Sequence, residues 1–250
     1  MVSIPWLDPL DQTQGFPPAE HALTEPDGLL AAGGDLNPQR LLNAYKNGIF
    51  PWYEAGHPIL WWSPNPRAVL FIHEFKFHRS LRKKVRHAGM RVTFDQAFPD
   101  VMAECARTPR RGQHGTWISP EMLQAYTLLH HMGHAHSVEV RDDSNNLIGG
   151  LYGIALGRVF FGESMFSHCN DASKIGFATL LCHLQDWGFR LVDCQQATHH
   201  LTFLGAREIP RADFLQLIDR DIRMPGKPGP WHCDESLPVA DWKPQIPPKT

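Results

Sequence analysis

The chain has 250 residues, of which 42% are hydrophobic, and a formal charge of −2 when its 15 histidines are counted as neutral. This is enough apolar material for a buried core, while no stretch approaches the roughly 18 apolar residues that cross a membrane. The cysteine count of 5 is odd and includes no C-x-x-C pair, which excludes a disulfide framework and a thiolate zinc site. Residues 1–10 lack the basic start and apolar stretch of a signal peptide, so we expect a cytoplasmic protein.

The N-terminal part is divided into short loops by prolines and glycines. A helix is predicted to begin at Pro38, with Asn37 as its N-cap, and to stop at Gly48. Aromatic side chains then alternate with prolines at residues 49–53 and 60–67. Because proline removes a backbone donor, we predict that both segments are stiff loops without regular structure.

The tryptophans of these loops, Trp52, Trp61 and Trp62, have two interpretations. They can form a small core of their own, since tryptophan is usually largely buried. Alternatively, some of them line an apolar pocket, because rigid aromatic side chains on loops lose little entropy when a ligand binds. The sequence does not decide between the two.

A strongly basic run follows at residues 76–91, which hold seven lysines and arginines and no acidic residue. Arg79, Lys83 and Arg86 are spaced to share one helical face. A solvated helix face is the ordinary interpretation of such a run. We favour a phosphate-binding surface, because the like charges repel one another unless an anion lies on them. This surface can extend to Arg107, Arg110 and Arg111.

Several further elements are predicted before residue 141. In chain order they are a strand at 92–94, a helix at 95–107, an extended segment at 115–118, a helix at 120–132 capped by Ser119, and a strand at 137–140. His130 and His134 lie one helical turn apart, which suggests a metal site. We reject a metal here and at His199 and His200, because no carboxylate completes a ligand set and histidine at a helix end is commonly a cap.

The segment from residue 149 to residue 196 is the centre of the predicted fold. Strands at 147–156 and 158–161 read as a hairpin with its turn at Gly157 and Arg158. A helix begins near Ala172, with Asp171 or Ser173 as its N-cap, and ends at Gly188. A strand at 191–192 follows.

These strands bring polar groups to the end of the sheet. The hairpin's second strand leads to Glu163, and the strand at 191–192 leads to Asp193 and Gln195. A carboxylate at a strand end is often only a cap or an ion-pair partner. Beside an aromatic wall and a basic surface, however, the three residues indicate a site for an amine, an apolar group and an anionic partner together.

After residue 196 a short helix ending at Gly205 and a helix from Pro210 to Ile222 are predicted. The tail from Met224 holds seven prolines and reads as an extended, low-complexity segment with little chemistry. The alternation of strands and helices indicates a mixed sheet flanked by helices, in an α/β or α+β fold. Neither G-x-x-x-x-G-K-[ST] nor G-x-G-x-x-G occurs, which argues against a nucleoside triphosphate or dinucleotide site.

The same residues carry a resemblance to a known family. The chain resembles the bacterial leucyl/phenylalanyl-tRNA–protein transferases from about Gly28 to Phe214. The resemblance rests on FPWY (50–53), WWSPNPRAV (61–69), GTWI (115–118), HAHSVEV (134–140), GESMFS (162–167), DASK (171–174) and LVDCQ (191–195). These motifs are long and unusual. DASK departs from the family's pattern, which usually begins with Asn.

This resemblance implies an enzyme that moves leucine, phenylalanine or methionine from aminoacyl-tRNA to the N-terminal amine of proteins that begin with Arg or Lys, and so marks them for N-degron degradation. It implies an α+β fold, in which a small N-terminal domain (1–70) precedes a GNAT-like catalytic domain (71–232) with a mixed sheet flanked by helices, and a proline-rich tail (233–250) follows. It also implies a monomer with no metal and no other cofactor.

The resemblance also assigns roles to residues. Asp193 and Gln195 match the pair that activates the acceptor amine, with Glu163 at the same centre, and Arg79, Lys83 and Arg86 fall in the tRNA-binding cluster. We expect Gln195 to position the amine by hydrogen bonding and Asp193 to orient it. The pocket for the transferred side chain and the terminal adenosine matches Trp52, Trp117, Leu151, Phe160, Phe177, Leu180, Leu184 and Val192.

Two rival interpretations remain at this point. In one, Cys194 is a nucleophile served by His199 or His200, which would make the chain a thiol acyltransferase or amidase. In the other, the chain is a non-catalytic RNA-binding module and the basic run carries its function.

Overall fold

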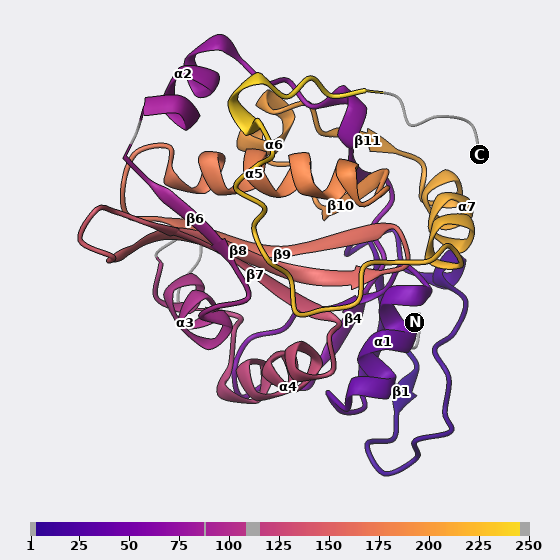
Figure 1. The fold of residues 1–250 in the computed structure, drawn as a ribbon. Coiled ribbons are helices and arrows are strands. Elements are labelled where there is room, and N and C mark those ends of the chain that lie inside the picture. The colour runs from indigo at the N-terminus through magenta and orange to yellow at the C-terminus, as the bar shows by residue number, and fades with distance from the viewer. Residues whose placement is uncertain (1–3, 88, 109–115, 246–250) are drawn as a thin grey trace.

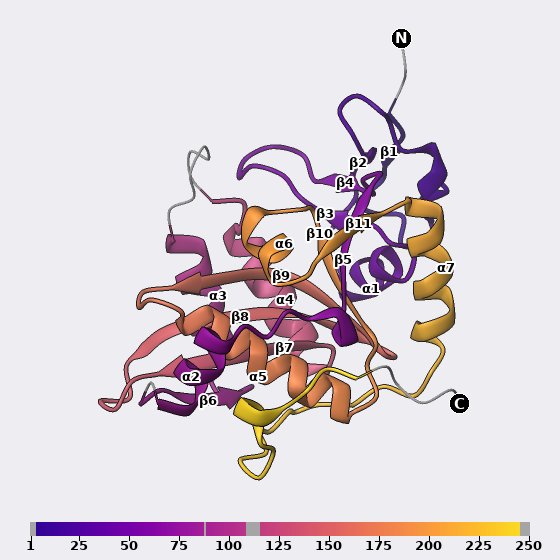
Figure 2. The same ribbon diagram turned by 90° about the horizontal axis from the view of Figure 1, so that it is seen from above.

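The computed structural model describes residues 4–87, 89–108 and 116–245, and within these ranges the chain forms two β-sheets with helices around them (Figures 1 and 2). The strands are β1 (Trp6–Leu7), β2 (Leu29–Gly33), β3 (Phe50–Pro51), β4 (Leu60–Trp62), β5 (Arg67–Phe71), β6 (Arg91–Phe94), β7 (Ala135–Arg141), β8 (Leu147–Leu156), β9 (Val159–Ser167), β10 (Leu191–Gln195) and β11 (Arg207–Ile209). The α-helices are α1 (Pro38–Lys46), α2 (Arg79–His87), α3 (Phe98–Arg107), α4 (Pro120–His131), α5 (Ala172–Asp186), α6 (His199–Phe203) and α7 (Arg211–Ile222). No helix in the described ranges is both long enough and apolar enough to cross a membrane.

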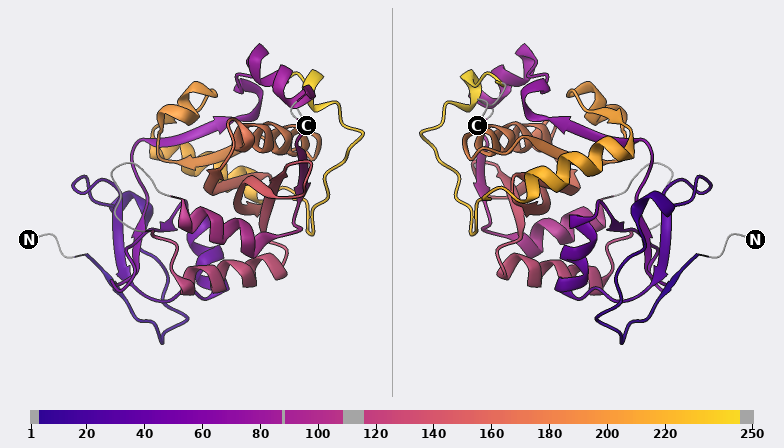
Figure 3. Two further views of the ribbon diagram at one scale, coloured as in Figure 1. Left: turned by 90° about the vertical axis from the view of Figure 1, so that its left-hand side faces the viewer. Right: turned by 90° about the vertical axis from the view of Figure 1, so that its right-hand side faces the viewer.

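The smaller sheet has the order β1-β2-β4-β3 and lies at one end of the molecule (Figure 3). It corrects the prediction that the aromatic and proline-rich segments have no regular structure, because β3 and β4 are formed by Phe50–Pro51 and Leu60–Trp62. The reason is that β3 is an edge strand, where the missing N–H of Pro51 removes no bond from the interior of the sheet.

The larger sheet has the order β11-β5-β10-β9-β8-β7-β6. Its strands β6 to β9 are antiparallel neighbours, whereas β9 and β10 run parallel, with α5 as the crossover between them. The predicted hairpin, helix and strand of residues 147–195 are therefore confirmed. So is the α+β architecture, in which a small N-terminal sheet precedes a mixed sheet flanked by helices.

The turn between β8 and β9 shows why a glycine is required there. Gly157 has a φ of +54°, and a Cβ at this position would lie 2.3 Å from the carbonyl oxygen of Ile222 in α7. Both the left-handed backbone and the close approach of α7 exclude a larger residue. The predicted turn at Gly157 and Arg158 is confirmed, and α7 packs directly on it.

Helices cover both faces of the larger sheet (Figure 1). Helix α5 lies on one face, and α3 and α4 lie on the other, while α1 packs beside α4 and α7. Helix α4 begins as predicted, since the Ser119 hydroxyl accepts a hydrogen bond from the Met122 backbone N–H at 3.2 Å. At His130, where the sequence suggested a metal that we rejected, the Nδ1 atom bonds to the Ala135 carbonyl at 2.8 Å.

Helix α3 begins three residues later than predicted. Asp95 has a φ of +57° and so cannot continue a helix. Its carboxylate instead accepts hydrogen bonds from the backbone N–H groups of Ser137 and Trp231, at 2.9 Å and 2.6 Å, and contacts the His136 ring at 2.8 Å. Asp95 thus joins β7 to the C-terminal segment.

The C-terminal segment lacks α-helices and strands between residue 224 and residue 245, as predicted, but it is firmly packed. Trp231 is fully buried and its ring stacks on His136 at 3.6 Å, and Trp242 is also buried. An aromatic side chain of this size buries roughly 150–250 Å². The prolines therefore predicted correctly that this segment has no α-helix or strand. Its packing against the rest of the protein depends on the two tryptophans.

Candidate active site

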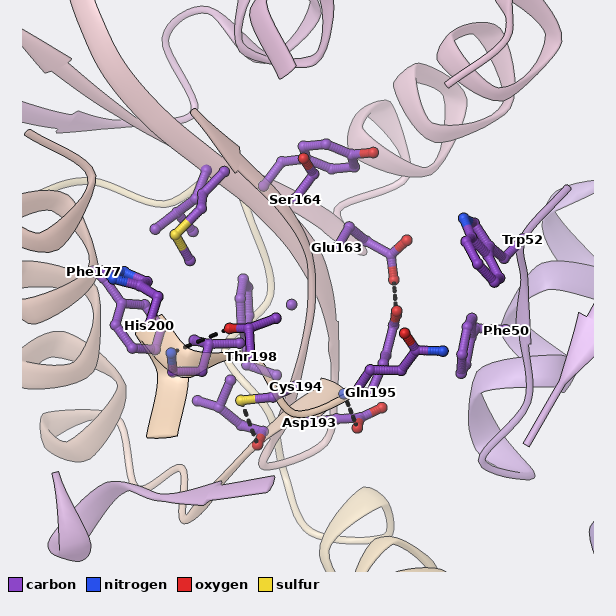
Figure 4. Close-up of a pocket in the computed structure, with 18 of the residues that line it drawn as sticks. Phe50, Trp52, Glu163, Ser164, Phe177, Asp193, Cys194, Gln195, Thr198 and His200 are labelled. Carbon is purple, nitrogen blue, oxygen red and sulfur yellow. Dashed lines mark hydrogen bonds between the residues drawn. The ribbon is translucent and has the colours of Figure 1, made fainter. Parts of the chain in front are cut away.

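A cavity of about 380 Å³ opens between the N-terminal sheet and the larger sheet (Figure 4). It is lined by residues of β3, β8, β9, β10, α5 and α6, and by Trp52 and Trp117 from two loops. Of the predicted pocket residues, Leu180 and Leu184 are instead fully buried in the core beside Phe160 and Phe177. The members of the predicted set that line the cavity are Trp52, Trp117, Leu151, Phe160, Phe177 and Val192.

The loop tryptophans divide between the two interpretations of the sequence. Trp61 is fully buried and donates its ring N–H to the Gly33 carbonyl at 2.9 Å, so it belongs to the core. Trp52 is half-buried and lines the cavity, with Trp62 packed edge-on against it at 5.7 Å. Core and pocket wall are thus built from neighbouring tryptophans.

Backbone irregularities aim the polar side chains into the cavity. Parallel pairing of β9 and β10 ends at Phe161 and Asp193, and Glu163 and Gln195 each follow two residues later. The register of β9 against β8 shifts at Glu163, and that of β10 against β5 shifts at Cys194, so both strands carry a bulge here. Because a bulge redirects side chains, Glu163 and Gln195 meet across the gap between the strands.

Glu163 is hydrogen-bonded to several polar side chains around it. Its Oε1 atom accepts hydrogen bonds from the Tyr45 hydroxyl at 2.7 Å and the Gln195 side-chain amide at 2.8 Å, and its Oε2 atom accepts one from the Tyr126 hydroxyl at 3.2 Å. The hydroxyls of Tyr45 and Tyr126 also contact each other. Helices α1 and α4 therefore hold the carboxylate in a fixed direction, with part of Oε2 left for a ligand.

The environment of Glu163 changes its acidity. Burial raises the pKa of Glu163 to about 7, although the hydrogen bonds from Tyr45, Tyr126 and Gln195 act in the opposite direction. Burial also raises the pKa of Tyr45 and Tyr126 well above the ordinary value, so both hydroxyls stay protonated. A carboxylate with this pKa exchanges protons near neutral pH.

Asp193, which is expected to orient the amine, is held by a buried ion pair. Its side chain is 0% exposed and forms a double hydrogen bond with Arg67, whose side chain is also 0% exposed, at 2.8 Å and 2.7 Å. The Oδ1 atom of Asp193 also accepts a hydrogen bond from the backbone N–H of Gln195 at 2.9 Å. Asp193, which also lines the cavity, therefore fixes the bend at Gln195, which has a φ of +61°.

The residues that sequence analysis missed are Arg67, Tyr45 and Tyr126. Arg67 lies in the motif WWSPNPRAV, and Tyr45 lies on the apolar face of α1. Neither was identified as a site residue, because the sequence does not show which distant residue each one contacts. The available signal was an arginine among aromatic and apolar residues. Such neighbours favour burial, and a buried charge requires a partner such as a carboxylate.

Cys194, the thiol nucleophile of the first rival interpretation, has an unfavourable setting. Burial, and then the charge of Asp193, raise the pKa of the Cys194 thiol far above its ordinary value. The thiol therefore remains protonated, whereas a thiolate is the reactive form. Burial also lowers the pKa of His200, which lines the same cavity.

The predicted basic face is exposed on α2. Arg79, Lys83 and Arg86 are all exposed, and Arg86 pairs with Asp241 at 2.5 Å. No carboxylate of the described residues pairs with Arg79 or Lys83. Of the predicted extension, Arg107 pairs with Glu104 at 2.7 Å, and Arg110 and Arg111 lie outside the described residues.

Comparison with known proteins gives a consistent result over most of the chain. A family model described as leucyl/phenylalanyl-tRNA protein transferase matches residues 69–219, and a model for the N-terminal domain of the same proteins matches residues 34–65. The chain is 54% identical to the leucyl/phenylalanyl-tRNA–protein transferase of Hydrogenovibrio crunogenus, with 95% of this chain and 90% of the relative covered. It is 56% identical to that of Stutzerimonas stutzeri, with 91% of this chain and 95% of the relative covered.

Among solved structures the overlap is more distant. The structure of L-PGS from Bacillus licheniformis has a TM-score of 0.40 at 10% identity, over 53% of this chain and 46% of that one. Spermidine N-acetyltransferase from Vibrio cholerae has a TM-score of 0.28 at 16% identity, over 41% of this chain and 64% of that one. Neither bears on function. The family models and the sequence relatives show that the chain belongs to the leucyl/phenylalanyl-tRNA–protein transferase family, and it is therefore an enzyme that transfers an aminoacyl group from tRNA to protein.

Proposed function

We propose that the enzyme transfers leucine, phenylalanine or methionine from aminoacyl-tRNA to the N-terminal α-amine of proteins that begin with Arg or Lys, and thereby marks them for N-degron degradation. It acts as a monomer in the cytoplasm, where charged tRNA is available, and without a cofactor. The observation that carries the proposal is Glu163, a carboxylate with a pKa of about 7 that is held beside Gln195 at an apolar cavity.

The cavity suits the donor. Its aromatic and aliphatic walls, which include Trp52, Trp117 and Phe177, accept the apolar side chain and the terminal adenosine of the aminoacyl-tRNA. A pocket of this kind separates side chains that differ by one methylene by only about 10- to 200-fold. Leucine, phenylalanine and methionine are therefore all accepted, whereas a charged side chain would lose its hydration without gaining a partner.

Glu163 and Gln195 suit the acceptor amine. The ordinary pKa of an α-amine is about 7.7–8.0, so proton transfer to a carboxylate of pKa about 7 costs little. The amine nitrogen then attacks the ester carbonyl, the new C–N bond forms, and the C–O bond to the tRNA ribose breaks. The proton taken by Glu163 passes to the departing ribose oxygen, the second proton that the nitrogen loses on becoming an amide then passes to Glu163 and on to solvent, and Gln195 holds the amine in line.

The reaction needs no covalent enzyme intermediate. An ester attacked by an amine already runs towards the more stable amide, so alignment and removal of one proton are sufficient. Arg67 and Asp193 support this alignment as positioning residues, because their ion pair and the bond from Asp193 fix the backbone of Gln195.

Replacing Cys194 by Ala is expected to leave kcat within about threefold of the wild-type value, because a thiol of raised pKa contributes little to nucleophilic catalysis. The measurement is the rate of leucine transfer from Leu-tRNA to an Arg-peptide. Cys182→Ala, which changes a buried cysteine of α5, serves as a matched buried control. A loss of about 10³-fold or more in the Cys194 variant alone would support the thiol acyltransferase instead.

The tRNA is proposed to bind along α2, where Arg79, Lys83 and Arg86 supply phosphate contacts. Arg86 would exchange its pairing with Asp241 for a phosphate oxygen.

The direct test of the proposed function uses labelled Leu-tRNA and a panel of peptides. Peptides that begin with Arg or Lys are expected to receive leucine, whereas an acetylated Arg-peptide and a peptide that begins with Ala are not. Transfer to every free amine at the same rate would refute the acceptor specificity. Binding of tRNA without any labelled peptide would favour the RNA-binding module.

A further inference from the structure

Helix α6 connects the edge of the cavity to the start of the basic helix α2. Thr198, His200 and Leu201, at its beginning, line the cavity. Thr198 and His200 are labelled in Figure 4. Phe203 ends the helix, and it is one of the large hydrophobic residues that the described part of the chain leaves exposed, at 52%. An aromatic ring this exposed beside a functional cavity requires a reason.

The ring of Phe203 is held in place from behind. It stacks on the ring of His78, with the centroids 4.4 Å apart and the planes at 25°, and the His78 Nε2 atom is hydrogen-bonded to the Phe203 carbonyl at 3.2 Å. The backbone N–H of Lys76 donates to the Leu204 carbonyl at 2.9 Å, which fastens the two segments together. Because His78 covers one face of Phe203, the exposed area belongs to the opposite face and the ring edges.

The surroundings of this ring are cationic. Arg79 follows His78 directly and opens α2, and Lys76, Arg79 and Lys83 are all exposed. Glu74, the carboxylate at the start of the same segment, is already paired with Arg207 at 2.8 Å. A preformed aromatic face beside unpaired cations is the combination that binds single-stranded nucleic acid, since bases stack on the ring and phosphates meet the charges.

We propose that Phe203, backed by His78, is a stacking platform for the unpaired nucleotides that precede the terminal adenosine of the donor tRNA. This inference rests on the proposed function, in which the cavity holds the aminoacyl-adenosine and α2 holds the tRNA backbone. The connection through α6 then requires the cytidines before that adenosine to cross Phe203. The platform is tolerant of base identity, because every base has a stacking face.

The test compares two donors, full-length Leu-tRNA and leucyl-adenosine, which lacks the preceding nucleotides. Phe203→Leu is expected to raise the KM for Leu-tRNA by roughly 5- to 150-fold, the range that loss of one base stack produces, and to leave the KM for leucyl-adenosine unchanged. Phe203→Tyr, which keeps the aromatic face, is expected to retain the wild-type KM for both donors. Leu128→Ala, a similarly exposed residue on α4 at 47%, is the control and is expected to change neither.

A binding experiment covers the case in which leucyl-adenosine is too poor a donor to measure. Wild-type protein is expected to bind uncharged tRNA more tightly than the same tRNA without its 3′ CCA end, and Phe203→Leu is expected to lose that difference. If removal of the CCA end weakens tRNA binding equally in the wild-type protein and in Phe203→Leu, Phe203 is not a stacking platform. A raised KM for the acceptor peptide instead of the tRNA, or a Phe203-dependent dimer in sedimentation, would also overturn the platform.

Failure of the platform differs measurably from failure of the tRNA surface. The double variant Arg79→Ala, Lys83→Ala is expected to weaken tRNA binding and to reduce its dependence on salt concentration, with or without the CCA end. If that variant weakens binding but Phe203→Leu does not, the platform is wrong and the tRNA surface stands. If neither does, the placement of the tRNA on α2 is wrong as well.

Discussion

Glu163→Gln is expected to lower kcat by about 10²- to 10⁴-fold, the contribution that a well-placed general base makes. Glutamine keeps the size of the side chain: its carbonyl oxygen can accept from Tyr45 at the Oε1 position, and its amide can donate to the Tyr126 hydroxyl at the Oε2 position, so the packing around position 163 is preserved. What it cannot do is take a proton from the acceptor amine. The measurement is single-turnover transfer from Leu-tRNA to an Arg-peptide at saturating peptide.

The pH dependence of kcat follows from the same residue. Below a pH of about 7 Glu163 carries a proton and cannot accept another, so wild-type kcat is expected to fall as the pH is lowered through that value. In Glu163→Gln this limb is expected to disappear, leaving only the titration of the amine itself. Tyr45→Phe removes a hydrogen bond that lowers the pKa of Glu163, so it is expected to move the limb to higher pH.

The matched control is Glu208→Gln, which removes an exposed carboxylate from β11. It is expected to leave both kcat and the pH profile unchanged. An unaltered acid limb in Glu163→Gln, even with a reduced kcat, would show that Glu163 positions the amine but does not accept its proton.

The elements around the site were predictable because their signals are local. The turn at Gly157, the cap at Ser119 and the change of period after Ala172 each depend on residues within one or two turns of one another. Glu163 and Gln195 were identified for the same reason, as polar residues at the ends of apolar strands. The family resemblance then supplied roles that the pattern alone could not.

The partners of these residues were not predictable, because they come from distant parts of the chain. Arg67 and Asp193 are 126 positions apart, and Tyr45 lies 118 positions from Glu163. The bulge at Cys194 was not predictable either, because nothing in the sequence of the strand marks where its regular alternation ends. Sequence analysis therefore found the groups at the cavity and missed those that hold them.

Replacing Arg67 by Met is expected to lower the free energy of unfolding by about 3–5 kcal/mol, because Asp193 is left as a buried charge without a partner. The guanidinium also donates to the Gly48 carbonyl at 3.1 Å and lies over the rings of Phe50 and Phe214, so its removal loosens the contact between α1 and the larger sheet. Urea denaturation followed by tryptophan fluorescence measures the change. The exposed pair of Arg207 and Glu74 supplies the control, since Arg207→Met is expected to cost only about 0–1 kcal/mol.

The double variant Arg67→Met, Asp193→Leu separates stability from function. With both charges removed, no buried ion remains unpaired, so most of the lost stability is expected to return. Activity is not expected to return with it, because the backbone N–H of Gln195 no longer has the Asp193 oxygen that fixes its bend. The rate of transfer should stay low in a protein that unfolds at nearly the wild-type urea concentration. Full activity in the double variant would mean that Gln195 is held by the strand alone, and that the ion pair serves only the core.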